Sequence, residues 1–168
     1  MRDRYLSSAR HVGLIFRKEM AAYFNSPVAY ITLVVFLLIG GWFFSSSFFL
    51  INESDLRMLF ATIPIIYLFF IPAISMGLIA RETSTGTMEL LVTLPLEDWE
   101  VVVGKYLAAV ALIAVGLLFT LVHLLTLVLV ATNLDPGAIF AGYLGLVLVG
   151  GVYAAAGIFC SAVTSNQI

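Results

Sequence analysis

The chain has 168 residues, of which 62% are hydrophobic and 11% are charged, and its formal net charge is -2. A soluble domain averages about half apolar and about 25% charged residues, so the composition excludes an ordinary soluble domain and indicates a protein of the lipid bilayer. The small net charge gives no sign of a broad basic surface, so no nucleic-acid partner is expected. The one cysteine, Cys160, cannot form an intrachain disulfide, and because it lies in an apolar run we expect a buried, inert thiol.

The N-terminal segment, residues 1–26, is basic and amphipathic. Its first 20 residues carry five basic side chains and no apolar core, so they are not a cleaved signal peptide. Residues 12–25 predict a helix with one apolar face, formed by Val12, Ile15, Phe16, Met20 and Tyr23. Glu19 interrupts that face, and Ser26-Pro27 ends the helix because the residue before a proline avoids the α region. We expect this helix to lie in the membrane interface; a cytoplasmic extension of the first span is the alternative.

Four long intervals without Asp, Glu, Lys or Arg follow this segment. A helix needs about 20 mostly apolar residues to cross the ~30 Å hydrocarbon core of a bilayer, and each interval is long enough. Because the apolar runs are continuous and not alternating, they favour helices over a β-barrel. We predict an all-α polytopic membrane protein whose transmembrane domain occupies 27–168, with spans at about 27–51, 59–80, 106–133 and 137–162.

The basic residues of the connections predict the orientation of these spans. The N-terminal segment carries five and the 81–105 connection carries two, whereas the opposite side carries only Arg57. The positive-inside rule therefore places the N terminus and the 81–105 connection in the cytoplasm. The predicted location is a bacterial-type inner membrane, crossed several times.

The 81–105 connection divides into a turn, a short apolar-faced segment and the start of the next helix. Residues 83–86 are turn-forming. Residues 87–92 predict a short helix that Pro95 stops, with Glu89 near its N-terminal end, where negative charge is favoured. Glu97, Asp98 and Glu100 then suit the first turn of the following helix. A solvated loop with ordinary caps is the alternative for the middle part.

Two features inside the spans are candidates for function or for packing. His123, in the third span, is an ionisable group near mid-membrane, which is by default a functional candidate. A hydrogen-bonded packing role is the alternative, since Thr120 and Thr126 are close in sequence. The fourth span repeats small residues four apart, as in Gly150 and Ala154, which predicts tight helix packing within the chain or between subunits.

The sequence lacks the motifs of the common nucleotide-binding proteins and hydrolases. No G-x-x-x-x-G-K-[ST] occurs, so this chain does not carry a P-loop, and neither H-E-x-x-H nor G-x-S-x-G is present. The carboxylates at 97–100 are better explained as charges at a helix start than as general acids or bases. We therefore expect no intrinsic catalysis, no cofactor and no metal.

Three stretches of the sequence resemble one family of membrane proteins. RKEMAAYFNSPVAYI (17–31), GLIARETSTGTMELLVTLPLEDWEVVVGKYLAA (77–109) and FCSAVTSNQI (159–168) are similar to the membrane subunit, or permease, of type-2 ABC exporters. Within that family they resemble the branch of the gliding-motility and copper-maturation permeases. Members of the family usually have six spans, so the four expected here suggest a truncated chain or a fragment.

The resemblance implies roles for two groups of residues. In this family the N-terminal amphipathic helix lies along the inner leaflet, which corresponds here to Arg17, Lys18, Tyr23, Phe24 and Pro27. A Gly-Thr-x-Glu-Leu-Leu stretch is similar to the coupling helix that docks in a groove of a separate ATPase subunit. We call the matching residues the coupling residues; they are Gly86, Thr87, Met88, Glu89, Leu90 and Leu91.

The resemblance therefore implies a permease subunit of an ABC transporter, driven by ATP that a separate cytoplasmic subunit hydrolyses. A second permease subunit, identical or different, would complete the translocation path in the bilayer. A non-transport membrane scaffold or assembly factor is the alternative. A secondary transporter is a third hypothesis, but such proteins usually place more acidic residues in their spans than this chain does.

Overall fold

The computed structural model describes residues 2–51, 56–75, 97–130 and 135–163. Within these ranges the protein is helical and contains no strand. The elements are α1 (Arg2–Phe24), α2 (Pro27–Ser46), the π-helical turn η1 (Ser47–Ile51), α3 (Arg57–Ser75), α6 (Asp98–Val130) and α7 (Pro136–Val163). The predicted all-α class is confirmed.

Four helices are long and apolar enough to cross a membrane: Ala29–Phe49 (α2 continuing into η1), α3, α6 and α7. α6 has 33 residues, which corresponds to about 50 Å at 1.5 Å per residue and exceeds the ~30 Å hydrocarbon core. Its charged residues all lie before Tyr106, and the rest of the helix is apolar. The first turns of α6 therefore extend beyond the hydrocarbon at one end of the bundle.

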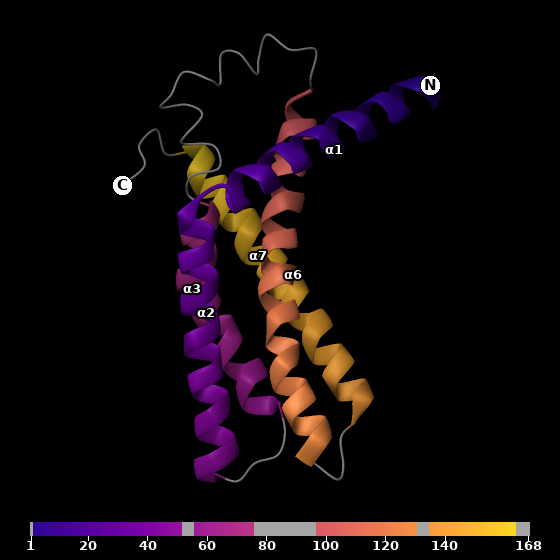
Figure 1. Ribbon diagram of the computed structural model, residues 1–168. Helices are drawn as coiled ribbons and strands as arrows, with labels where there is room; N and C mark the ends of the chain where they lie inside the picture. The colour runs from indigo at the N-terminus through magenta and orange to yellow at the C-terminus, as the bar shows by residue number, and fades with distance from the viewer. Residues whose placement is uncertain (1, 52–55, 76–96, 131–134, 164–168) are drawn as a thin grey trace.

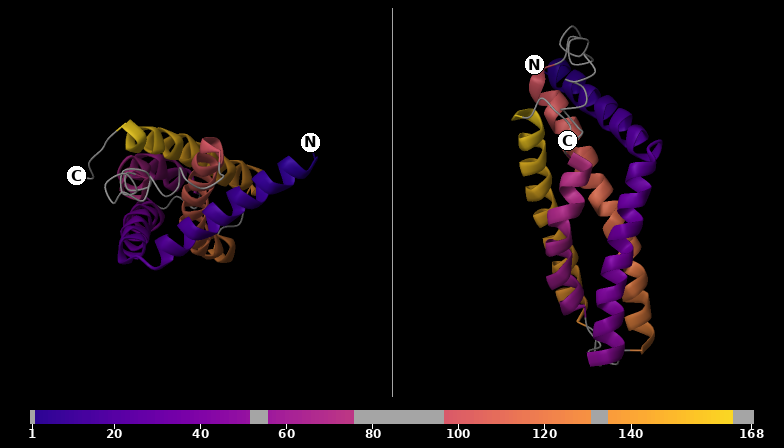
Figure 2. Two further views of the ribbon diagram at one scale, coloured as in Figure 1. Left: turned by 90° about the horizontal axis from the view of Figure 1, so that it is seen from above. Right: turned by 90° about the vertical axis from the view of Figure 1, so that its left-hand side faces the viewer.

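These four helices form a four-sided bundle (Figures 1 and 2). α2 packs beside α3, α3 beside α7, α7 beside α6, and α6 beside α2. Successive helices run in opposite directions, so the end of α3, the start of α6 and the end of α7 gather at one end of the bundle. α1 lies obliquely across this same end, against the first turns of α6 (Figure 1).

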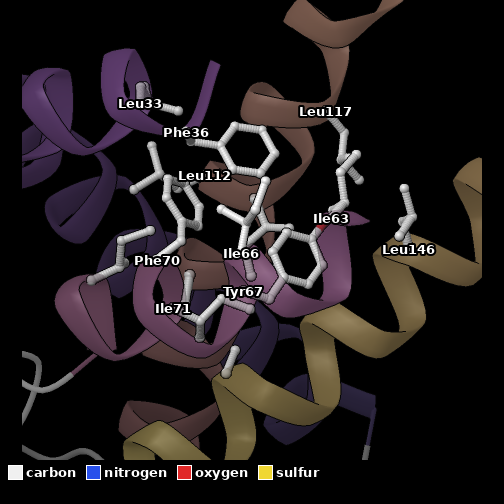
Figure 3. Packing of buried hydrophobic residues seen from close by; sticks show 14 of the residues in the cluster. Leu33, Phe36, Ile63, Ile66, Tyr67, Phe70, Ile71, Leu112, Leu117 and Leu146 are labelled. Carbon is white, nitrogen blue, oxygen red and sulfur yellow. The ribbon is translucent and has the colours of Figure 1, made fainter. Parts of the chain in front are cut away.

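The core lies where side chains of all four long helices meet (Figure 3). The ring centroid of Phe36 in α2 is 4.7 Å from that of Phe70 and 6.1 Å from that of Tyr67, both in α3. Leu112 of α6 and Leu146 of α7 complete this cluster and are buried. Because lipid tails are as apolar as these side chains, the bundle is held by close packing and not by exclusion of water.

The small residues of α7 allow its close approach to α3 and α6. A Cβ on Gly150 would stand 2.9 Å from Ile113 Cγ2 of α6. A Cβ on Gly142 would overlap the Phe60 ring of α3. Ala154, four residues after Gly150, is fully buried. Gly142, Gly150 and Ala154 of the small-residue pattern thus serve helix packing within the chain.

Carboxylates mark the starts of the two longest apolar helices. At the start of α6, Glu97 N donates to Glu100 Oε2 at 3.2 Å, so a side chain in the first turn satisfies an otherwise free backbone N–H. At the start of α7, Asp135 Oδ1 accepts from Gly137 N at 2.9 Å and Ala138 N at 3.3 Å. The predicted placement of acidic residues in the first turn of α6 is confirmed.

The expectation of a buried thiol is wrong, because Cys160 is exposed on the surface of α7. The buried residues of this part of α7 are Ile158 and Ser161, and Cys160 falls off the face that they share. Its neighbour Phe159 is also exposed. An apolar run places a residue in the membrane region but does not say which side of the helix faces the bundle.

Candidate functional site

The described residues place a polar junction between α1 and the first turns of α6. These turns hold the charges that precede the apolar run of α6, and they lie beyond the four-helix core. Among the described residues, the junction is the largest contact that α1 makes with another helix. It brings together residues from both stretches, 17–31 and 77–109, that carry the family resemblance.

An ion pair is buried in this junction. Lys105 Nζ donates to Glu19 Oε1 at 2.9 Å, and Lys105 is 1% exposed and Glu19 8%. A buried charge is tolerated when it is paired and hydrogen-bonded. The acidic residue that interrupts the apolar face of α1 therefore has a specific partner, 86 positions away in the sequence.

Gly104, next to Lys105, lets the two helices approach closely. A Cβ at this position would stand 2.7 Å from Ile15 Cγ2 and 3.2 Å from the Val12 carbonyl oxygen. Since the Val12 oxygen is backbone and cannot swing away, a larger residue at 104 would push α1 off α6. Gly104 thus provides the surface for close contact, and Lys105, the next residue, provides the charge.

A second polar contact lies at the start of α6. His11 Nδ1 is 3.0 Å from Glu100 Oε2, where the ring N–H donates to the carboxylate. Hydrogen bonds from the Ser8 side chain first, and also from the Glu97 N–H and His11, hold the pKa of Glu100 below its ordinary value, although its burial acts in the opposite direction. Glu100 is therefore a charged group at the α1 contact, and not only a helix cap.

The other end of α1 contacts α3 and leads into α2. Tyr23 OH donates to the Ile74 carbonyl near the end of α3, at 3.5 Å. A short turn at Asn25 and Ser26 then separates α1 from α2, with Ser26 N donating to Tyr23 O at 3.1 Å. α1 is thus a separate helix that contacts α6 and α3 and connects directly to α2.

The residues expected in an interfacial helix lie mostly on the outside of this arrangement. Arg17, Lys18 and Phe24 are exposed on α1, and Pro27 is the exposed first residue of α2. The apolar face of α1 is directed at α6, with Ile15 buried. The position of α1 in the membrane interface stays a prediction.

The coupling residues, 86–91, lie outside the described residues. Ser75 and Glu97, the described residues on either side, belong to the end of the bundle that α1 crosses. The connection between α3 and α6 is therefore attached at the same end as the α1–α6 junction.

His123 is half-buried where α6 meets α2. Its Nδ1 donates to the Thr120 carbonyl at 3.1 Å, and its ring meets the Phe44 ring edge-on at 4.7 Å between centroids. A Cβ on Gly41 of α2 would stand 3.4 Å from His123 Nε2. Among the described residues, no group of three or more His, Cys, Asp or Glu could hold a metal ion. The contacts favour a packing role for His123.

An apolar groove of about 480 Å³ opens between α2 and α3. Val35 and Phe43 of α2 face Ile65 and Phe69 of α3 across it, and all four are exposed large hydrophobic residues. Such a lining suits only apolar groups, since its polar surface is small.

A comparison with known protein families finds that the family described as ABC-2 family transporter protein matches residues 14–167. The chain belongs to this family. The match begins within α1 and includes the junction, the coupling residues and all four long helices. No curated protein and no solved structure matches the chain.

Membership of the ABC-2 family, with four membrane-capable helices, makes this chain a multi-pass membrane component of a transporter. In the family, the membrane component works with an ATP-binding partner and is not itself catalytic. The resemblance suggested by the sequence is therefore confirmed at the level of the family.

Sequence reasoning missed the pairing of Glu19 with Lys105 and of His11 with Glu100. The signal for the first pair was present as two anomalies of opposite sign: an acid in the apolar face of α1, and a base directly before a long apolar run. His11 lies on the same side of α1, one and two turns before Ile15 and Glu19. Nothing local in the sequence connects either residue of α1 with α6.

Proposed function

We propose that this chain is the permease subunit of an ABC transporter, driven by ATP that a separate cytoplasmic subunit hydrolyses. The coupling residues dock on that ATPase subunit. Met88 and Leu91 supply apolar contact there, and Glu89 supplies a polar or charged one. A second permease subunit completes a translocation path between the two copies.

The observation that carries the proposal is the common placement of α1 and both ends of the α3–α6 connection. The basic residues of α1 lie at the end of the bundle where Ser75 and Glu97 are found. By the positive-inside rule this end faces the cytoplasm. The coupling residues are then attached on the side where an ATPase can reach them, and the N terminus is cytoplasmic.

The membrane in question is a bacterial-type inner membrane. The alternative function is a non-transport scaffold or assembly factor, which shares the membrane helices but has no need of an ATP-binding partner. Recovery of an ATPase with the chain distinguishes the two functions.

Affinity purification of this chain from the membranes of its native host, with detection of any co-purifying ABC ATPase, tests the proposal. Gly86→Pro breaks the helix that we propose, and Glu89→Arg reverses its charge. A lost hot-spot contact of about 2 kcal/mol would weaken ATPase binding roughly thirtyfold.

The matched control is Glu53→Arg, which makes the same exchange in the connection between the first two spans, on the opposite side of the membrane. It should recover as much ATPase as the wild type. Equal ATPase recovery by Gly86→Pro, Glu89→Arg and the wild type would contradict the docking role.

A further inference from the structure

The junction between α1 and α6 is more than a packing contact. We propose that the Glu19–Lys105 ion pair fastens α1 to α6 as a strut, so that a displacement of the coupling residues reaches α2 through α1. This inference rests on the proposed function, and it makes Glu19 and Lys105 positioning residues for the transport step.

Three contacts at one-turn spacing fix α1 on α6. His11, Ile15 and Glu19 are four residues apart, so they lie on one face of α1. They meet Glu100, Gly104 and Lys105 respectively. A row of three contacts along the helix resists both sliding and rolling, and a single contact would allow both.

The ion pair adds a charged contact to the register of this row. Ile15 against Gly104 is a close apolar contact that needs a glycine at 104, but shifting it separates no charges. In contrast, any slip that separates Lys105 Nζ from Glu19 Oε1 breaks a 2.9 Å charged hydrogen bond in a place from which water is largely excluded. The exposed Lys18, whose Nζ is 3.8 Å from Glu19 Oε1, makes a longer contact with the same carboxylate. No charged residue follows Lys105 until Asp135, so the pair stands at the edge of the apolar region, where screening is weak.

The strut connects two parts of the bundle: the start of α6, and the ends of α2 and α3 near it. The connection that holds the coupling residues runs directly into α6 at Glu97. At its other end, α1 contacts the Ile74 carbonyl of α3 through Tyr23 and continues into α2 after a short turn. A push on the start of α6 is therefore shared with α2 through a stiff helix.

Spin labels at Leu14 of α1 and Leu144 of α7 measure how firmly α1 is held. Both side chains are exposed, and Cys160→Ser removes the native thiol so that only the two introduced cysteines carry a label. We expect one narrow distance distribution by pulsed electron paramagnetic resonance for the otherwise wild-type chain in lipid nanodiscs. E19Q and K105Q should each broaden it or add a second population.

The charge-swapped variant E19K/K105E should restore the narrow distribution, because the pair re-forms with its charges exchanged. The control R10Q removes one exposed charge from the same helix and should leave the distribution unchanged. If a single variant does not accumulate in the membrane, the double variant E19Q/K105Q replaces it, because it removes both charges of the pair. E19Q/K105Q should also broaden the distance distribution or add a second population. The strut would be overturned if the distance distribution of E19Q/K105Q, and of each single variant that accumulates, were the same as that of the wild type.

A second measurement joins the strut to transport. In complexes with the ABC ATPase that co-purifies with this chain, E19Q should recover ATPase as the wild type does but lower the ATPase rate of the complex. The expected decrease is about twofold to thirtyfold, the range by which mutations between coupled sites change coupling. An unchanged rate would overturn the role in coupling, whereas failure of the wild type to recover any ATPase would instead contradict the proposed function.

Discussion

At the scale of single residues, charges that look misplaced in the sequence acquire partners in the structure. Glu19 interrupts an apolar helix face, and Lys105 stands directly before an apolar run, yet the two form one buried ion pair. Sequence reasoning could identify each anomaly, because periodicity is a local property. It could not pair the residues, because their contact depends on how α1 crosses α6.

The carboxylate of Glu100 makes the α1–α6 contact sensitive to acid. Its pKa is lowered by hydrogen bonds, first from Ser8 and then from Glu97 and His11, so folding favours the charged form. The resulting stabilisation is fully present above the ordinary carboxyl pKa of about 4.3 and is lost as the pH falls through the lowered pKa. Below about pH 4.3, the melting temperature of the wild type should fall more steeply than that of E100Q. Parallel curves for the two proteins would contradict this assignment.

At the scale of helices, the sequence predicted the number and kind of long apolar helices well, because continuous apolar runs are a strong signal. The start of one helix was predicted too. α6 begins at Asp98, well before the apolar run, where the acidic residues of the sequence indicated the first turn of a helix. The π-helical turn at Ser47–Ile51 was not predicted, since nothing beyond a run of serines distinguishes it from an α-helix in the sequence.

Two glycines of α7 test its close packing as a matched pair. Gly150→Ala should destabilise the protein by about 1–3 kcal/mol, because the new Cβ meets Ile113 and the core must shift. Gly145→Ala has no atom within 4 Å, so it should be neutral or stabilising by up to about 1 kcal/mol through helix propensity. Unfolding in detergent with increasing denaturant measures both. Equal effects of the two substitutions would show that Gly150 does not lie at a tight contact.

The start of α7 depends on the Asp135 carboxylate, which accepts from two backbone N–H groups. Asp135→Ala should lower the free energy of unfolding by about 0.5–2 kcal/mol, as for other helix caps, whereas Asp135→Ser should retain most of it. The same unfolding measurement decides between them. If the serine variant were as unstable as the alanine variant, Asp135 would not stabilise α7 by capping it.

At the scale of the whole molecule, family membership and architecture were both within reach of the sequence, and the match over residues 14–167 confirms the family. The two parts of the candidate site were not equally predictable from the sequence. The coupling residues came from resemblance alone and lie outside the described residues, so their role stays a proposal. The α1–α6 junction came only from the structure, because it joins segments 86 residues apart. Under the proposed function, force enters at the end of the bundle where α1 crosses α6.

The side of the membrane on which residue 88 lies tests this account most directly. In a Cys160→Ser chain, a cysteine at Met88 should react with a membrane-impermeant maleimide in inside-out vesicles but not in intact cells whose outer barrier is permeabilised. A cysteine at Glu53, in the opposite connection, should show the reverse pattern. Labelling of position 88 from outside would contradict the account, because no cytoplasmic ATPase could then reach the coupling residues.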